Sequence, residues 1–158
     1  MSWPDPVERV AVFLRASGAE SRLEEFRSDV SSAQMAADAI GCDLDQIVKS
    51  LVFVCDGRPV LALVPGDRRA DPAKIGVAVG AFETRVARAS EVVDATGVAP
   101  GAVGPFPPPA GVPILVEQTL LSRPVVWVGG GSDRHMAMVA PPELVRLTSG
   151  STVDIVQE

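Results

Sequence analysis

The sequence contains few of the residues on which many common functional sites depend. It has no Tyr, 4% aromatic residues, one His and two Cys among its 158 residues. So few aromatic side chains argue against a stacking platform for single-stranded nucleic acid. A structural zinc site needs about four nitrogen or sulfur ligands, so we expect neither a metal nor a cofactor.

Long apolar runs are also missing. No stretch approaches the roughly 20 residues that a membrane helix requires, so no membrane contact is expected. No secretory signal is recognisable, which predicts a reduced, cytoplasmic protein. The formal net charge is −6, so a broad positive surface for phosphate backbone is absent. Any contact with a nucleic acid must therefore be small and local, or be assisted by a second protein.

Periodicity and turn signals predict many short elements in one domain spanning 1–158. Helical patterns are seen at 7–26 (interrupted at Gly18), 31–41, 43–49, 71–79, 90–96 and 142–147. Strand patterns are seen at 50–55, 58–64, 84–89, 113–117, 125–128, 135–140 and 152–156. Because the strands do not alternate with long helices, we expect an α+β fold. The prediction is a compact domain with a mixed, largely antiparallel, barrel-like sheet surrounded by short helices.

Three features could form a site, and each also has a purely structural explanation. Lys49 stands between a helical pattern and an apolar strand, where it either closes the helix dipole or receives a phosphate or carbonyl. The Gly/Pro loop at 101–105 is either a rigid connector or a wall of backbone N–H groups. His135 follows the glycines at 129–131 and is more often a hydrogen-bonded structural residue. No Gly-x-Ser-x-Gly motif precedes it, so a serine triad is not indicated.

Several ordered blocks resemble the YbaK/EbsC family of aminoacyl-tRNA deacylases, whose fold is also inserted as the editing domain of bacterial prolyl-tRNA synthetase. The main block is SSAQMAADAIGCDLDQIVKSLVFVCDGRPVLALVPGDRRAD, with QIVKSL and DPAK as its most specific pieces. TGVAPGAVGPF, VVWVGGG and APPELVRLTSGSTVDI match the family's loop, last strands and terminal helix. Three positions depart from the pattern. Gly129 replaces a Ser of some members, with Ser132 nearby as a candidate substitute for its hydroxyl, and Ala102 and Pro107 replace glycines.

The resemblance implies a trans-acting deacylase that hydrolyses the ester of a mischarged tRNA. A tRNA for proline carrying a small wrong residue such as Ala or Cys is the first candidate substrate. The expected partners are the tRNA acceptor end and an aminoacyl-tRNA synthetase. The implied catalytic residues are Lys49 and Gly101. The implied substrate-binding residues are Ser50, Leu51, Phe53, Ala102, Val103, Gly104, Pro105, Gly129, Gly130 and His135. The alternative is a non-catalytic module of the same fold that binds an aminoacyl-tRNA or nucleotide.

Overall fold

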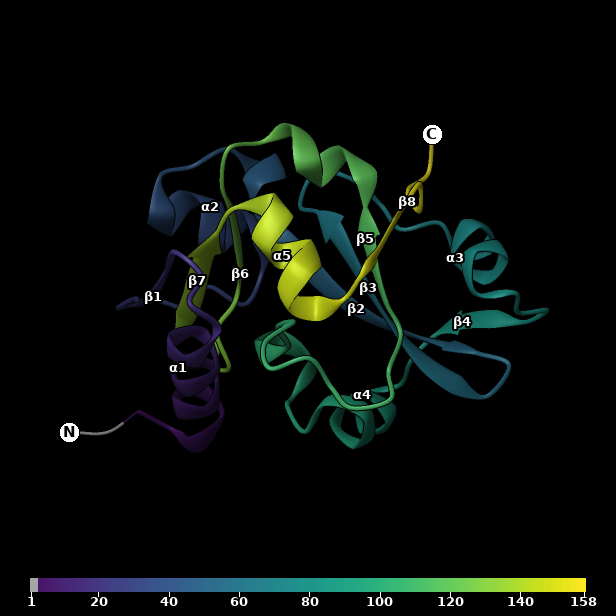
Figure 1. Cartoon of the computed structure of the whole chain (residues 1–158), viewed down its shortest axis with the longest axis horizontal. Helices are drawn as coiled ribbons and strands as arrows, with labels where there is room; N and C mark the ends of the chain where they lie inside the picture. The colour runs from purple at the N-terminus through teal and green to yellow at the C-terminus, as the bar shows by residue number, and fades with distance from the viewer. Residues whose placement is uncertain (1–2) are drawn as a thin grey trace.

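Two β-sheets flanked by short helices make up the fold (Figure 1). The computed structural model describes residues 3–158, so positions 1 and 2 of the predicted domain lie outside it. The larger sheet has the order β4 (Thr84–Val86), β2 (Val48–Cys55), β3 (Arg58–Pro65), β5 (Ile114–Glu117), β8 (Ser151–Val153). The smaller has the order β1 (Ser21–Glu25), β7 (His135–Val139), β6 (Val126–Gly129).

Strand directions confirm the predicted mixed, largely antiparallel arrangement. Only the β3–β5 and β5–β8 pairs are parallel among the paired strands of residues 3–158. The sheets stay open, so the barrel-like part of the prediction is replaced by two separate sheets. The α-helices are α1 (Asp5–Ser17), α2 (Ala33–Ile40), α3 (Pro72–Val79), α4 (Ala89–Thr96) and α5 (Pro141–Thr148). Short 3₁₀ turns are η1 (Leu44–Gln46), η2 (Pro100–Ala102) and η3 (Gln118–Ser122).

Local sequence signals explain most of these elements. Asp71 caps α3 by accepting hydrogen bonds from the N–H groups of Ala73 and Lys74. Between β2 and β3, Asp56 and Gly57 both have positive φ, as a tight hairpin turn requires. None of the helices within residues 3–158 is long and apolar enough to cross a membrane.

Two predicted helical segments are not helical. Residues 21–25 form β1, because they pair with all five residues of β7. After Asp43 the chain makes only the 3₁₀ turn η1 and then enters β2 at Val48, so Lys49 is the second residue of a strand. The cap of α2 is Ser32, whose hydroxyl accepts a hydrogen bond from Met35 N.

The two sheets meet where β2 begins and β6 ends, a place we call the seam (47–50 and 127–129). Ile47 forms a parallel bridge to Trp127 of β6, ahead of the region in which β2 pairs with β3. One hydrophobic cluster spans both sides of the seam, because Val48 and Val52 pack in the same core as Val128. The seam therefore brings the start of β2 next to the turn that follows β6.

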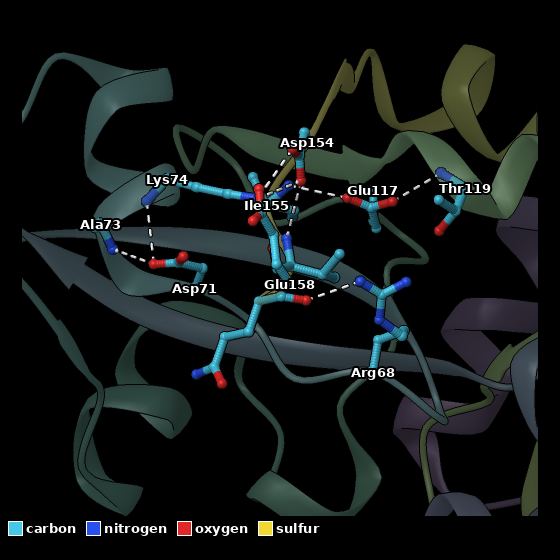
Figure 2. A network of polar contacts seen from close by, with 11 residues as sticks. Arg68, Asp71, Ala73, Lys74, Glu117, Thr119, Asp154, Ile155 and Glu158 are labelled. Carbon is cyan, nitrogen blue, oxygen red and sulfur yellow. Dashed lines mark hydrogen bonds and ion pairs between the residues drawn. The ribbon is translucent and has the colours of Figure 1, made fainter.

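A polar network fixes the C-terminal segment (Figure 2). Glu117 is 0% exposed, and its carboxylate accepts hydrogen bonds from the N–H groups of Thr119 and Ile155 at 2.8 and 2.9 Å. The bond from Thr119 makes Glu117 the N-cap of η3. Lys74 of α3 pairs with Asp154 at 3.0 Å. The residues that follow β8 are thereby held against the end of β5 and against α3.

Candidate functional site

A cavity of about 320 Å³ opens at the seam. Its walls come from the start of β2, the turn before α2, the loop containing η2 and the β6–β7 turn. Six of the predicted site residues line it: Lys49, Ser50, Leu51, Gly101, Val103 and Gly129. Three larger hollows, of about 350, 460 and 530 Å³, are lined by none of the predicted residues. Chemistry rather than size therefore identifies the cavity at the seam as the candidate site.

Lys49 reaches this cavity from β2 and is half-buried. Its Nζ donates a hydrogen bond to the carbonyl oxygen of Arg68, in the loop between β3 and α3. Burial lowers the pKa of Lys49 below its usual value, and Asp67 opposes this shift. An ammonium has three N–H donors, so the bond to Arg68 leaves two for a ligand.

Ser50 supplies a polar atom without a partner. Its Oγ is inaccessible to solvent and makes no hydrogen bond, although the residue lines the cavity. An unsatisfied buried hydroxyl costs about 1–3 kcal/mol, so such a group usually has a functional explanation. Because this Oγ is closed to solvent, a ligand in the cavity would supply the missing hydrogen bond only after the Ser50 side chain rotates toward it.

Two glycines let the η2 loop and the β6–β7 turn touch through their backbones. A Cβ on Gly129 would lie 2.4 Å from Val103 O, and one on Gly104 would lie 2.0 Å from Gly129 O. Neither position tolerates a side chain without a backbone shift. The serine that some family members have in place of Gly129 would therefore collide with Val103 here. Gly101 differs, because a Cβ there would meet only the Cβ of Ser31, at 3.4 Å.

Other predicted residues lie outside the cavity lining. Phe53 follows Leu51 by two residues along β2 and is buried in a second hydrophobic cluster. Ala102 and Gly104 line a separate hollow of about 40 Å³ against α1, and the Ala102 N–H donates to Ala99 O. Pro105 is buried. Gly130 is also buried, and its N–H donates to the carbonyl oxygen of His135.

His135 stands behind the cavity wall and touches it through Ser132. The imidazole is 3% exposed, and its Nδ1 lies 2.6 Å from the hydroxyl oxygen of Ser132, which does line the cavity. Its Nε2 is buried without a hydrogen bond and lies 4.0 Å from Glu25 Oε2. Burial lowers the pKa of His135, although Glu25 and Asp133 oppose the shift. Burial therefore favours the neutral form of the ring.

Sequence reasoning missed two of the three serines at the edge of the cavity, and it named Ser132 only as a substitute for the hydroxyl that Gly129 lacks. Ser31 and Ser32 line it from the turn that precedes α2, and Ser132 lines it from the β6–β7 turn. The only available signals were the capping pattern before α2 and a serine three residues before the one histidine. The cavity thus combines one cation, several hydroxyls and close-packed backbone, and no carboxylate among residues 3–158 lines it. Such a lining suits a ligand with both anionic and N–H or O–H groups.

Comparisons with known proteins agree on one family. A family profile described as an aminoacyl-tRNA editing domain matches residues 27–147. Proline–tRNA ligase of Acidithiobacillus ferrooxidans is 29% identical over 124 residues, which cover 72% of this chain and 22% of the ligase. The ligase of Lactobacillus johnsonii is 32% identical over 106 residues, which cover 67% of this chain and 19% of that ligase. This chain thus spans about a fifth of the curated relatives it matches.

Solved structures give the same result. The crystal structure of a proposed trans-editing enzyme for prolyl tRNA synthetase superposes with a TM-score of 0.90 and 34% identity. The match covers 99% of this chain and 100% of that one. A likeness of this extent reaches from β1 to the C-terminal strand and includes the seam.

Proposed function

Because this chain belongs to the aminoacyl-tRNA editing domain family, we propose that it is a trans-acting aminoacyl-tRNA deacylase. Residues 1–158 would act as one editing domain in the cytoplasm. The substrate would be a tRNA, with tRNA for proline as the first candidate, whose terminal adenosine carries a small wrong amino acid such as Ala or Cys. The reaction adds water to the ester, and it releases the amino acid and the free tRNA end.

One observation carries this proposal: Lys49 and Ser50 of β2 line one cavity with Gly101 and Val103, which come from a distant part of the chain. The Lys49 ammonium would anchor the terminal phosphate or ribose of the tRNA. The N–H groups of Gly101 and Val103 are the candidates for holding the carbonyl oxygen, since that of Ala102 is bonded to Ala99 O. Charge developing on that oxygen in the transition state would then meet fixed donors.

Strong base catalysis is not required, because an aminoacyl ester is already activated. Positioning supplies much of the acceleration when the reacting atoms are held close together. Water would attack the carbonyl carbon, and a ribose hydroxyl of the substrate would assist it. At about 320 Å³ the cavity must share its space between the ribose and the amino acid, so small side chains would fit and large ones would not.

The rival proposal is a binding module that holds an aminoacyl-tRNA without cleaving it. It is favoured by the absence of a carboxylate or an imidazole from the cavity lining among the described residues. The two proposals differ in one measurement. A deacylase turns over one or more tRNAs charged with Ala, Cys, Ser, Thr or Pro, whereas a binding module protects the ester from spontaneous hydrolysis.

The chain offers a matched pair of variants for the lysine. Lys49 lines the cavity, whereas Lys74 pairs with Asp154 in the C-terminal network. We expect Lys49→Met to lower kcat/KM for deacylation by about 10- to 100-fold, because a hydrogen bond to a charged group is lost. Lys74→Met is expected to keep the wild-type rate at a temperature at which both variants are folded. Equal rates for Lys49→Met and wild type would remove the lysine from the mechanism.

A further inference from the structure

The position of one proton on His135 decides what Ser132 presents to the cavity. A serine hydroxyl has one proton to donate and two lone pairs to accept hydrogen bonds. One lone pair of Ser132 Oγ is taken, because the N–H of Arg134 donates to it at 3.0 Å. The second neighbour is His135 Nδ1 at 2.6 Å. If Nδ1 carries a proton, both lone pairs are used and Ser132 can only donate to a ligand. If Nδ1 is bare, Ser132 can only accept.

Glu25 selects between these two states. The β1–β7 register places Glu25 directly opposite His135, and its carboxylate lies 4.0 Å from Nε2. A carboxylate accepts hydrogen bonds and cannot donate them, so it favours the tautomer with the proton on Nε2. The Glu25 side chain is 58% exposed and is free to move closer. Nδ1 is then the acceptor, and the Ser132 hydroxyl donates a hydrogen bond to it.

We propose that Ser132, held as an acceptor by His135, binds the α-amino group of the aminoacyl ester. The identity of this ligand rests on the proposed function. An aminoacyl ester has N–H donors on its α-amino group, and no Asp or Glu within residues 3–158 lines the cavity to receive them. Lys49 repels an ammonium and suits the phosphate end instead. Ser132 contacts the substrate, and His135 and Glu25 are positioning residues that act through it.

The tautomer can be measured without any ligand, because His135 is the only histidine in the chain. Nitrogen NMR of the tag-free protein at pH 7.5 gives one pair of imidazole signals. The expected result is a protonated Nε2 and a bare, hydrogen-bonded Nδ1. Glu25→Ala should move the ring toward the other tautomer, because the acceptor that faces Nε2 is removed. A wild-type ring that carries its proton on Nδ1 would overturn the proposal.

Recognition of the amino group is tested by two stable analogues of the charged tRNA end. These are 3′-alanylamino-3′-deoxyadenosine and 3′-propionylamino-3′-deoxyadenosine, which differ only in the amino group. We expect the wild type to bind the alanyl analogue about tenfold more tightly, as one hydrogen bond to a charged donor would give. Ser132→Ala should abolish this preference, and Glu25→Ala should reduce it. Ser90→Ala, on the exposed surface of α4, should keep it in full.

The outcomes separate this proposal from the deacylase proposal. An alanyl preference that survives in Ser132→Ala, or no binding of either analogue to the wild type, would overturn the role of Ser132. A wild type that prefers the alanyl analogue but cleaves no ester in the tRNA panel would contradict the deacylase and support amino-group recognition. Both analogues contain an amide in place of the ester, so binding is measured without hydrolysis.

Discussion

Replacing Gly129 by alanine tests how tightly the cavity depends on the contact between two backbone segments. A Cβ at this position would lie 2.4 Å from Val103 O, whereas ordinary contacts begin at 3.4 Å. The η2 loop and the β6–β7 turn must therefore separate by about 1 Å to accept one methyl group. Val103 and Gly129 both line the cavity, so this movement changes its shape directly.

The expected effects of Gly129→Ala follow from that displacement. Overpacking of this kind costs about 1–3 kcal/mol in the free energy of unfolding. For a chain of this size each kcal/mol lowers the Tm by roughly 2–4 °C, so we expect a decrease of about 2–12 °C. A misplacement of about 1 Å costs roughly a hundredfold in rate when positioning supplies the catalysis, so kcat/KM for deacylation should fall by about that factor. Differential scanning calorimetry and single-turnover deacylation measure the two effects.

Gly101→Ala is the matched comparison for stability. Gly101 lines the same cavity, but an added Cβ would meet only Ser31 at 3.4 Å, and its φ is not positive. Alanine at a glycine position without strain stabilises a protein by about 0.4–1 kcal/mol through the unfolded state. The Tm of Gly101→Ala should therefore stay level or rise slightly while that of Gly129→Ala falls. If Gly129→Ala retains the wild-type Tm and kcat/KM, the close contact is not needed and the reasoning fails.

Two further predictions concern buried and exposed carboxylates. Glu117→Gln keeps only one of the two side-chain oxygens that accept hydrogen bonds from backbone N–H groups. The free energy of unfolding, measured in urea, should therefore fall by about 1.5–3 kcal/mol. An unchanged urea midpoint would contradict the role of this carboxylate. Hydrogen bonds from Arg85, and from the backbone N–H of Arg88, lower the pKa of Glu91 to about 2. Its ion pair therefore stabilises the fold above about pH 4.5 and loses this effect as the pH falls toward 2. The stability difference between wild type and Glu91→Gln should shrink between pH 6 and pH 3, and an equal difference at both would contradict the pairing.

Much of the fold could be predicted where local signals and tertiary pairing agree. The β2–β3 hairpin follows from two apolar runs joined by Asp56-Gly57, and α3 follows from Asp71 before a proline. Residues 21–25, SRLEE, have no strand signal of their own, and only their pairing with β7 makes them β1. The separation into two sheets could not be predicted either, because it depends on pairing between strands that are far apart in the sequence.

The candidate site shows the same division. Resemblance to the family indicated Lys49 and Gly101, which line one cavity in the structure. Phe53 lies on the same face of β2 as Leu51, but two residues further along, roughly 7 Å deeper into the sheet. From the sequence, Ser132 was indicated only as a nearby substitute for the hydroxyl that Gly129 lacks. Its proposed role depends on the turn that brings it to His135 and on the β1–β7 register that places Glu25 opposite His135. No local sequence pattern predicts either of these.

The distribution of unsatisfied polar atoms provides an independent reason to place ligand binding at the seam. Within residues 3–158, four buried side-chain nitrogen or oxygen atoms lack a hydrogen bond. Two of them, Asp45 Oδ1 and Arg123 Nε, face each other at 3.7 Å, and His135 Nε2 faces Glu25 at 4.0 Å. These three have a charged counterpart that a small movement brings into range. Ser50 Oγ has no such counterpart and lines the cavity. A stable fold rarely leaves a buried hydroxyl unpaired, and this Oγ is closed to solvent, so a ligand in the cavity would pair with it once the Ser50 side chain rotates toward the cavity.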